Sequence, residues 1–490
     1  MTVPDIRIQK CNDADINDHG EFVLYWMTAN RRPVWNFSLQ RAVDHAKDLK
    51  KPLLIFEALR CSYQWASDRI HHFVIAGMAD NTTAFQKTKA LYFPYLEPKP
   101  GAGKGLLEEL ARRSCIVVTD DFPCFFLPRM VEAVAKQMQV RLEKVDSNGI
   151  FPMRGTDRVF SRAHDFRRFL QKNLRPHLQE FPIADPLKRI RIPELEEIPA
   201  DIGRKWPSAD VAIIADQPAR LAEFPVDHSV GIIDIHGGFR AANEKLKRFS
   251  NSNIQRYPEY RNQPEEDVVS GFSPYLHFGH ISGHQIFTKL MDDEEWTRDD
   301  LAEKASGSRE GWWGCSPMLE AFLDQLITWR EVGYNMCWQR DDYDQYESLP
   351  EWAQTTLQEH ARDLRTSVYS LEEFEAAATH DKLWNAAQTQ LVREGCIHNY
   401  LRMLWGKKIL HWSESPRAAL DIMIELNNKY AIDGRNPNSY SGIFWVLGRY
   451  DRAWGPERDI FGKVRYMTSE NTARKVRVKQ YVEKYRSQNS

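Results

Sequence analysis

The sequence predicts an N-terminal, doubly wound (Rossmann-like) parallel α/β domain, a long connector and a C-terminal all-α domain. Two patterns support this prediction. Between about residues 20 and 150, short apolar runs alternate with amphipathic stretches of helical period, which is typical of a parallel sheet covered by helices. From about residue 236, apolar residues recur at helical spacing and strand signals become few. We expect a flexible arm over 1–19, the α/β domain over 20–179, an interdomain connector over 180–235 and the helical domain over 236–490.

Five apolar runs are predicted to form the buried strands of the sheet. They cover residues 21–26, 52–58, 91–96, 115–119 and 140–145, and helical candidates lie between them at 38–49, 66–89, 103–113 and 127–138. Any ligand of such a sheet should bind beyond the carboxyl ends of its strands. Seven prolines recur between Pro182 and Pro225, which predicts a connector wrapped over the surface rather than a further domain.

The composition is that of an ordinary globular protein from a reducing compartment. The 490 residues are 42% hydrophobic and 27% charged, and no apolar run approaches the roughly 20 residues of a membrane-spanning helix. Seven cysteines without a CxxC pair argue against a disulfide framework and against a zinc or iron–sulfur site. The acidic N-terminus does not resemble a signal peptide. We expect no membrane association and a cytoplasmic location, or a nuclear one in a eukaryote.

The net charge of −2 gives no overall reason to expect a nucleic-acid partner, but the charge is unevenly distributed. From Arg449 to the C-terminus there are eleven Lys or Arg residues against five Asp or Glu, and the stretch 162–175 is also basic. Charge alone more often marks a solvated face than a DNA contact. Aromatic residues interleave with these basic residues, which strengthens the DNA interpretation.

Three tryptophans near the C-terminus are spaced for either of two roles. Trp405 and Trp412 lie seven residues apart, so their rings project from one face of a helix. Trp384 belongs to the preceding predicted helix. An indole is both an apolar packing group and an oxidisable ring, so the series could fill a core or relay electrons. Spacing alone favours core packing.

Two shorter patterns carry less weight. Residues 101–105 (GAGKG) lack the full spacing of a phosphate-binding loop, and a flexible loop entering a helix is the favoured interpretation. His277, His280 and His284 could share one helix face, but no carboxylate or thiolate lies at matching spacing, so no metal site is expected.

Several longer motifs resemble those of the class II DNA photolyases. They are residues 381–412 (DKLWNAAQTQLVREGCIHNYLRMLWGKKILHW), 270–279 (SGFSPYLHFG), 426–430 (LNNKY), 433–435 (DGR) and 461–467 (FGKVRYM). The similarity covers essentially the whole chain after about residue 20 and is densest after residue 250. Several long motifs in the family's order make a far more specific signal than any single short pattern.

This resemblance implies that the helical domain binds FAD in a bent form and that the partner is UV-damaged DNA. In the implied reaction, excited FADH⁻ donates an electron to a flipped-out cyclobutane pyrimidine dimer, the ring bonds split and the electron returns, which makes the protein a light-dependent carbon–carbon lyase. Trp405, Trp384 and Trp412, in this order outward from the flavin, would relay electrons that reduce its oxidised form. The family also allows an antenna chromophore, a folate or a deazaflavin, at the strand carboxyl ends or the domain interface.

The resemblance also assigns flavin contacts. In the family, the residues matching Arg402 and Asp433 form an ion pair beside the isoalloxazine ring, and Asn427 matches an asparagine that faces flavin N5. Its amide can accept from a protonated N5 or donate to an unprotonated one. Ser273-Pro274 predicts a helix start capped by Ser273, whose exposed N–H groups suit the flavin pyrophosphate. The remaining implied flavin contacts are Tyr257, Ser270, Gly271 and Phe272.

Lesion binding is assigned by the same resemblance to aromatic and basic residues. A dimer must leave the duplex to reach a cofactor, and flat indoles give the extruded bases a stacking surface worth roughly 1–3 kcal/mol per base. An arginine can fill the gap left in the duplex and hold phosphate. The implied contacts are Trp445, Arg452, Trp454 and Arg465, together with Arg261, Gln325, Trp329 and Met403.

Three departures from the family pattern concern the substrate. Gln325 stands where the family has a glutamate, and an amide cannot donate an acidic proton or carry charge. The loop from Trp445 to Trp454 is one residue shorter, with Tyr450 in place of a usual histidine. The stretch 288–316 is longer than the family's.

Two alternatives therefore stay open beside the repair of cyclobutane dimers. One is a cryptochrome-type blue-light photoreceptor that acts through a signalling protein partner. The other is a flavin photoenzyme for another lesion, such as the (6-4) photoproduct, or for a substrate other than DNA. Arg452 and Trp454 favour DNA, whereas Gln325 and the short loop favour a changed substrate.

Overall fold

The computed structural model describes residues 2–486, which form two compact units. The first unit contains the chain up to Thr156 together with Leu174–Lys247 and Gly271–Arg298. The second contains Asp157–Asn173, Arg248–Ser270 and the chain from Asp299 onward. Each unit is therefore assembled from segments that are separated in sequence. The segment 180–235, predicted to be a connector, lies within the first unit.

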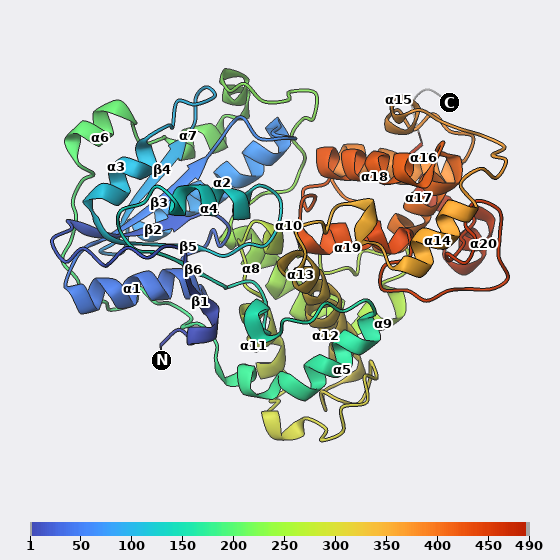
Figure 1. Cartoon of the computed structure of the whole chain (residues 1–490), viewed down its shortest axis with the longest axis horizontal. Coiled ribbons are helices and arrows are strands. Elements are labelled where there is room, and N and C mark those ends of the chain that lie inside the picture. The colour runs from blue at the N-terminus through green and yellow to red at the C-terminus, as the bar shows by residue number, and fades with distance from the viewer. Residues whose placement is uncertain (1, 487–490) are drawn as a thin grey trace. The chain divides into compact units, whose positions relative to one another are not determined.

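The first unit is built on a six-stranded sheet with the strand order β1-β6-β5-β2-β3-β4 (Figure 1). The strands are β1 (Ile8–Lys10), β2 (Phe22–Met27), β3 (Leu53–Leu59), β4 (Leu91–Leu96), β5 (Ser114–Asp120) and β6 (Leu142–Val145). Strands β2 to β6 are parallel and confirm the five predicted strands. The additional strand β1 pairs antiparallel with β6, so the segment predicted to be a flexible arm contributes an edge of the sheet.

Helices cover both faces of this sheet. The helices of the first unit are α1 (Phe37–Leu49), α2 (Asp68–Phe85), α3 (Leu106–Arg113), α4 (Leu127–Ala135), α6 (Ala200–Lys205), α7 (Val211–Asp216), α8 (Phe239–Arg248), α10 (Ser273–His277) and α11 (Gly283–Asp292). Val23 and Tyr25 of β2 belong to the core cluster that includes α1, whereas the intervening Leu24 belongs to the cluster that includes α3 and α4. Because strand side chains alternate between faces, this pattern confirms the doubly wound prediction.

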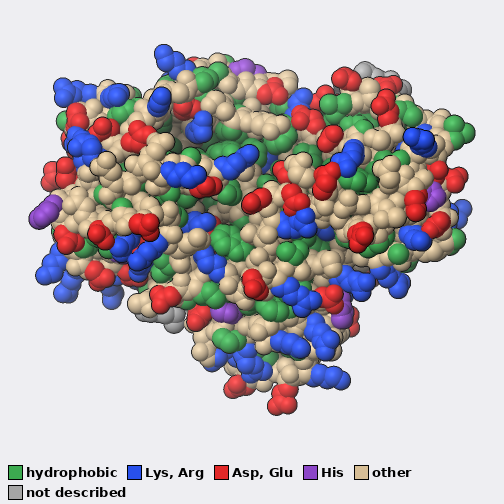
Figure 2. Space-filling model, in the orientation of Figure 1, with side chains coloured by type: hydrophobic (Ala, Val, Ile, Leu, Met, Phe, Trp, Pro, Cys, Tyr) green, Lys and Arg blue, Asp and Glu red, His purple; other side chains and the backbone are tan. Residues whose placement is uncertain are grey.

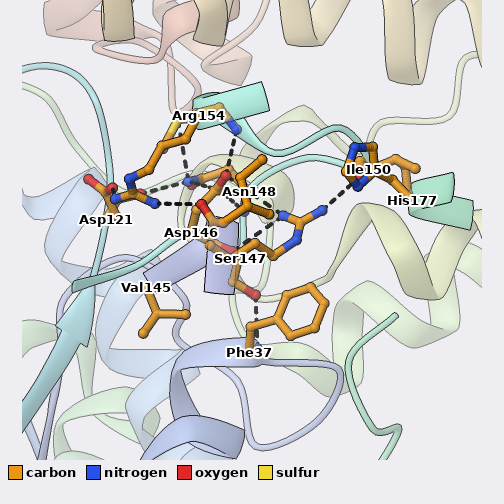
Figure 3. Close-up of polar contacts among 12 residues, drawn as sticks. Phe37, Asp121, Val145, Asp146, Ser147, Asn148, Ile150, Arg154 and His177 are labelled. Carbon is orange, nitrogen blue, oxygen red and sulfur yellow. Dashed lines mark hydrogen bonds and ion pairs between the residues drawn. The ribbon is translucent and has the colours of Figure 1, made fainter. Parts of the chain in front are cut away.

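Polar groups of the protein itself fill the carboxyl edge of the sheet beyond β5 and β6 (Figure 3). Asp146 follows β6 and accepts hydrogen bonds from the Met153 N–H at 2.7 Å and from Asn148 Nδ2 at 2.9 Å. Arg154 forms an ion pair with Asp121, which follows β5. Since a buried polar group is tolerated only when it is paired, these contacts fix this segment across the strand ends.

The second unit is helical, as predicted for the C-terminal part of the chain. Its helices are α5 (Ala163–Asn173), α9 (Ile254–Tyr260), α12 (Pro317–Leu323), α13 (Arg330–Gln339), α14 (Glu351–Glu359), α15 (Leu371–Glu375), α16 (Lys382–Glu394), α17 (Asn399–Trp412), α18 (Pro416–Tyr430), α19 (Pro437–Val446), α20 (Ser469–Lys475) and α21 (Lys479–Lys484). Two turns, η5 (Phe249–Asn253) and η7 (Asp324–Trp329), have π-helical hydrogen bonds that the sequence did not predict. None of the helices within residues 2–486 is long and apolar enough to cross a membrane.

Two glycines allow the helices that carry the site to approach closely. A Cβ atom at Gly333 of α13 would lie 2.6 Å from Ser441 Oγ and 2.7 Å from the Pro437 carbonyl oxygen, both on α19. At Gly406 of α17, a Cβ atom would lie 2.4 Å from the Val446 side chain at the end of α19. Helices α13 and α17 therefore pack this tightly against α19 because these two positions lack a side chain.

Candidate active site

Three tryptophans form a contiguous buried series across α16 and α17. The Trp384 indole N–H donates to the Trp405 carbonyl oxygen at 3.0 Å, and the Trp405 indole N–H donates to Gln388 Oε1 at 2.9 Å. The ring centroids of Trp384 and Trp412 lie 6.1 Å apart, with 73° between the ring planes. All three side chains are at most 2% exposed. Trp384 contacts both other tryptophans, so the three side chains pack together in the core, and their role as an electron relay stays a prediction.

The outer end of this series touches groups near the surface. The Trp412 ring centroid lies 4.9 Å from that of the exposed His380 and 5.7 Å from that of the half-buried Tyr369. The Tyr369 hydroxyl is hydrogen-bonded to His380 Nδ1 at 2.6 Å. Although Trp412 is itself buried, it therefore has direct ring contact with solvent-facing side chains.

The polar residues predicted to lie beside the flavin meet between α17 and α18. Arg402 Nη2 lies 3.5 Å from Asp433 Oδ1, and Arg402 Nη1 donates to Asn427 Oδ1 at 3.2 Å. Asn427 Nδ2 donates in turn to Ser439 Oγ at 2.8 Å. The ion pair implied by the family resemblance is present, although these residues are too far apart in sequence to be paired from spacing.

This cluster fits the redox-active ring of a flavin. The Arg402 and Asp433 side chains keep 18% and 13% of their surface exposed, whereas most of α17 is buried. A partly buried ion pair is costly unless other groups complete its surroundings, and an adjacent polar ring can do so. Asn427 is 2% exposed and is engaged by Arg402 and Ser439, so in this structure it orients Arg402. Its contact with flavin N5 stays a prediction.

The predicted flavin-binding segment that includes Tyr257 is divided between the two units. Tyr257 on α9 is 7% exposed, its ring packs edge-on against Phe249 and Phe322, and burial raises its pKa. The Arg261 guanidinium carbon lies 5.7 Å from the centroid of the Tyr257 ring. Ser270 is the last residue of this stretch in the second unit.

Gly271, Phe272 and Ser273 belong to the first unit, where they lead into α10. The predicted helix start is confirmed, with Pro274 in the first turn. The predicted cap is wrong, because Phe272 occupies the N-cap position with near-helical backbone angles and no side chain caps the helix. Ser273 is the first helical residue, and the binding of flavin by these residues stays a prediction.

Two tryptophans predicted to bind the lesion stack on each other. The ring centroids of Trp329, at the end of η7, and Trp445, on α19, lie 4.7 Å apart with 23° between their planes. Trp329 directly precedes α13, so the close packing of α13 and α19 at Gly333 supports the stack. Both rings are partly exposed and present aromatic surface outside the core, which is suited to a flat ligand.

Gln325 lies on the same turn as Trp329 and is also partly exposed. Its side-chain amide forms no hydrogen bond with the part of the chain that the structure describes. An amide carries two N–H donors and a carbonyl acceptor, so this side chain has its full hydrogen-bonding capacity available for a ligand. The residue that departs from the family pattern is thus placed where it can touch a substrate.

The cluster of Arg402, Asn427 and Asp433 and the Trp329–Trp445 stack lie about one turn of α19 apart. A Cβ atom at Gly442 of α19 would lie 4.0 Å from Arg402 Cδ. Trp445 follows Gly442 by three residues and so lies on the same side of α19. Met403, which is partly exposed, directly follows Arg402 on α17. Arg402, predicted to bind the cofactor, therefore lies close to Met403 and Trp445, predicted to bind the substrate, in the second unit.

A basic and aromatic loop follows α19. Trp454 is 37% exposed, and its indole N–H donates to Asp451 Oδ1 at 3.0 Å. The guanidinium carbons of Arg452 and Arg465 lie 4.8 Å and 5.4 Å from the Trp454 ring centroid. Both arginines are exposed, and neither forms an ion pair with a residue between positions 2 and 486. Their charges are available for phosphate groups.

Two buried residues near this loop, Tyr450 and Lys407, have positions that the sequence did not reveal. Tyr450 is 6% exposed with a φ of 65°, and its hydroxyl donates to the Val332 carbonyl at 3.3 Å, so it anchors the loop to α13. Lys407 on α17 is 1% exposed, its ammonium donates to the Val446 carbonyl, and burial lowers its pKa to about 7. A lysine in a predicted helix is usually at the surface, so no sequence signal marked Lys407.

Lys and Arg side chains gather over α5 on the face shown in Figure 2. The exposed basic residues of α5 and the stretch before it are Arg158, Arg162, Arg168 and Lys172. The backbone of Arg162 forms a parallel bridge with that of Tyr450, so this basic surface adjoins the loop that carries Arg452. Most basic residues of the stretch noted in the sequence are thus solvent-facing and next to the candidate site, whereas Arg167 is buried.

Known proteins resemble this chain over nearly its whole length. No protein-family model matches the chain. It is 33% identical over 481 residues to a protein of Methanothermobacter thermautotrophicus named deoxyribodipyrimidine photo-lyase, and the match covers 98% of each chain. Proteins with the same name from Potorous tridactylus and Arabidopsis thaliana are 30% and 31% identical. These matches cover 96% and 94% of this chain, and 82% and 88% of the two relatives.

The fold also resembles that of a solved protein. The crystal structure of a bacterial class III photolyase from Agrobacterium tumefaciens has a TM-score of 0.65, covering 95% of this chain and 86% of that chain at 16% identity. This likeness confirms the predicted combination of an α/β unit with a helical unit. Together with the near-full-length relatives at 30% identity or more, it leads to one conclusion: the chain belongs to the deoxyribodipyrimidine photo-lyase family.

Proposed function

We propose that this protein is a class II photolyase that repairs cyclobutane pyrimidine dimers in UV-damaged DNA with light and FAD. The observation that carries the proposal is the single helical turn of α19 between the Arg402 contact at Gly442 and the Trp329–Trp445 stack. A cofactor and an extruded lesion bound at these two places would lie side by side. The names of the relatives support this class of substrate.

In this proposal, the chain supplies binding, orientation and electrostatics. Bound FAD in its reduced, excited form supplies the electron that splits the dimer and then recovers it. Arg402 and Asp433 orient the flavin ring, and Tyr257 closes the pocket beside it. Trp329 and Trp445 stack against the extruded bases, and the Gln325 amide donates a hydrogen bond to a base carbonyl.

The exposed loop holds the DNA around the gap. Arg452 and Arg465 both lie close to the Trp454 indole, which places two cations and one flat ring at the surface. One arginine can enter the space that the dimer leaves, and the other can pair with phosphate. The basic residues of α5 extend this positive surface along the flanking duplex.

Trp405, Trp384 and Trp412 are proposed to reduce the oxidised flavin from the surface inward. Replacement of Trp405 by Phe is expected to abolish photoreduction of oxidised FAD, because phenylalanine is far harder to oxidise than an indole. Repair by chemically reduced enzyme should be unchanged, since the relay is not needed once FAD is reduced. Flash photolysis and a repair assay on the same sample would check both results. Normal photoreduction in this variant would exclude the proposed relay.

A second chromophore, if present, is proposed to lie beyond β3 and β4. The chain's own polar groups pair at several strand ends: the Asp120 carboxylate accepts from three successive N–H groups after β2, Asp146 holds the segment after β6, and Glu97 after β4 accepts from the Cys61 N–H after β3. Near the end of β3, partly exposed Trp65 stacks on Phe125 at 6.0 Å, and Tyr63 lies beside them. Such an aromatic cluster suits a flat folate or deazaflavin. An absorbance spectrum of the purified protein after FAD extraction would identify it.

The central experiment uses an oligonucleotide with one cyclobutane thymine dimer. The protein would be photoreduced, mixed with this DNA and illuminated, and the recovery of intact thymines would be measured against a dark control. Light-dependent recovery is expected. If recovery is absent although FADH⁻ is detected spectroscopically, the (6-4) photoproduct becomes the next substrate to test, because Gln325 removes an acidic side chain from the pocket. Failure with both lesions would point to a photoreceptor.

The variant Arg452→Ala separates a DNA enzyme from a receptor. A DNA enzyme should lose binding to damaged duplex, because Arg452 has no ion-pair partner in the described chain and its charge is free for phosphate. A receptor should keep its light-driven reduction of FAD, which does not require DNA, and should keep its signalling. Fluorescence anisotropy with labelled damaged duplex would measure the difference.

A further inference from the structure

We propose that Arg167 is a positioning residue of the lesion pocket, which acts through Asp324 to fix the orientation of the Trp329 indole and hence the Trp329–Trp445 stack. This inference rests on the proposed function of that stack as a lesion platform. Arg167 lies on α5, far from the pocket in sequence, and no motif singled it out.

Arg167 and Asp324 form a buried, two-point ion pair. Arg167 Nε donates to Asp324 Oδ1 at 2.7 Å, and Arg167 Nη2 donates to Asp324 Oδ2 at 3.1 Å. Both residues are 6% exposed. Two parallel hydrogen bonds from the planar guanidinium fix the plane of the carboxylate as well as its position. Lysine could neutralise the charge but could not impose this geometry.

The oriented carboxylate then holds the indole. Asp324 Oδ2 also accepts a hydrogen bond from Trp329 Nε1 at 3.2 Å. In an ordinary α-helix, residues five apart point in directions about 140° different, so this contact would be out of reach. The π-helical turn η7 spans these two residues, and its i to i+5 bonding brings them to one side of the helix. The π-helical turn thus allows the hydrogen bond between the Trp329 indole and the Asp324 carboxylate.

A third contact connects Arg167 to the stretch that is longer than in the family. Arg167 Nη1 donates to the Gly307 carbonyl at 3.4 Å, and the Gly307 N–H donates to Gln171 Oε1 of α5 at 2.7 Å. Gly307 has a φ of 79°, a backbone conformation that favours glycine. The longer stretch is therefore fastened to α5 at the residue that holds Asp324.

The Asp324 carboxylate joins the ion pair to the indole, because it has acceptor capacity left after it binds Arg167. Here, the oxygen that receives Arg167 Nη2 also receives the indole of a residue whose ring is partly exposed and stacked on Trp445. When the carboxylate plane turns, the indole loses its acceptor, and the stack can rotate away from the lesion-binding orientation.

The test combines Arg167→Lys with Trp329→Phe, which keeps an aromatic ring but has no N–H to donate. Binding of an oligonucleotide with one cyclobutane thymine dimer would be measured by anisotropy for wild type, both single variants and the double variant. We expect Arg167→Lys to weaken binding about tenfold, the scale of one lost hydrogen bond. In the Trp329→Phe background, the same change should have no further effect. Arg393→Lys, at an exposed position of α16 that has no role in the proposed site, is the matched control and should bind as wild type does.

An equal loss of binding in both backgrounds would overturn the inference, because a purely structural role does not depend on the indole N–H. Unchanged binding by Arg167→Lys would overturn it as well. If Arg167→Lys does not fold, Arg167→Met/Asp324→Leu removes both charges and leaves no unpaired buried ion. This variant should retain flavin photoreduction yet bind the dimer as weakly as Trp329→Phe, and wild-type binding by it would contradict the proposal. Failure of the wild-type protein to bind or repair the dimer would instead refute the proposed function.

Discussion

At the scale of single residues, two departures from the family pattern have different meanings. Gln325 is partly exposed beside Trp329 and has no hydrogen-bond partner in the described chain, so it can act on a ligand. Tyr450 is buried with its hydroxyl on the Val332 carbonyl, so it acts on the loop that carries Arg452. The sequence could not distinguish the two positions, because a motif shows which residue has changed but not whether its side chain is exposed or buried.

Replacement of Gln325 by Leu is expected to weaken binding of the thymine-dimer oligonucleotide by about two- to tenfold, since one hydrogen bond to a base is lost. Photoreduction of FAD should stay as in wild type, because no contact of Gln325 reaches the tryptophan series. Anisotropy and flash photolysis would measure the two properties. Equal affinity of the variant and wild type would show that the amide does not touch the lesion.

At the scale of elements, the sequence predicted the strands and helices that follow from local apolar patterns. It missed the elements that form through contacts with other parts of the chain. The five parallel strands were found because each contains buried apolar residues within a short segment, although β6 (LEKV) also contains two charged residues. Strand β1 has one apolar residue and exists through its pairing with β6. The π-helical turn η7 was missed, because six residues are too few to reveal a different period. Its position decides where Asp324 and Trp329 meet, so the local geometry of the pocket could not be predicted.

Replacement of Gly333 by Ala should separate α13 from α19, because the new Cβ would meet Ser441 Oγ and the Pro437 carbonyl at 2.6 Å and 2.7 Å. We expect a loss of about 1–3 kcal/mol in the free energy of unfolding, together with weaker dimer binding as Trp329 moves away from Trp445. Urea titration and anisotropy would measure these effects.

Gly442→Ala is the matched control on α19. Its Cβ would meet only Arg402 Cδ, at an ordinary 4.0 Å, and alanine is a better helix former than glycine. This variant should be as stable as wild type or more stable. A similar loss of stability in both variants would show that the close approach at Gly333 is not the cause.

At the scale of the whole molecule, the residues of the candidate site that lie close together are spread from Arg167 to Arg465 and belong to the second unit, whereas the predicted flavin contacts Gly271–Ser273 belong to the first. The family motifs supplied most of the pocket residues, but spacing alone could not show that Arg402 pairs with Asp433 or that Trp329 stacks on Trp445. Arg167 was predicted only as part of a basic stretch on a solvated face or a DNA contact, and Lys407 was given no role, because the positions of both depend on burial and on partners on other helices. Contacts between residues that are far apart in sequence therefore determine the part of the site that could not be predicted from the sequence.

Lys407 should make the stability of the protein depend on pH. Burial lowers its pKa from 10.5 to about 7, Asp451 partly offsets this effect and Arg465 adds to it. Between these pKa values, the unfolded chain binds a proton that the folded protein does not, so stability rises from about pH 7 to pH 10 and is lost as pH falls. The slope from this residue is at most about 1.4 kcal/mol per pH unit.

The variant Lys407→Met removes this titration, so its unfolding free energy should rise less between pH 7 and pH 10 than that of wild type. Urea unfolding at several pH values would measure the slopes. Lys479→Met, at an exposed position of α21, serves as the control and should keep the wild-type slope. Identical slopes for Lys407→Met and wild type would show that Lys407 is not held neutral by burial.

The interleaving of the two units matters while the chain is being made. A ribosome delivers the N-terminus first, and units fold as their residues emerge. Arg248–Ser270 emerges before Gly271–Arg298, so a piece of the helical unit appears before the α/β unit has received α11. That piece must wait for the rest of the helical unit, with its apolar side chains uncovered. We therefore expect the nascent chain to depend on chaperones late in translation, and neither unit to be producible as one continuous fragment.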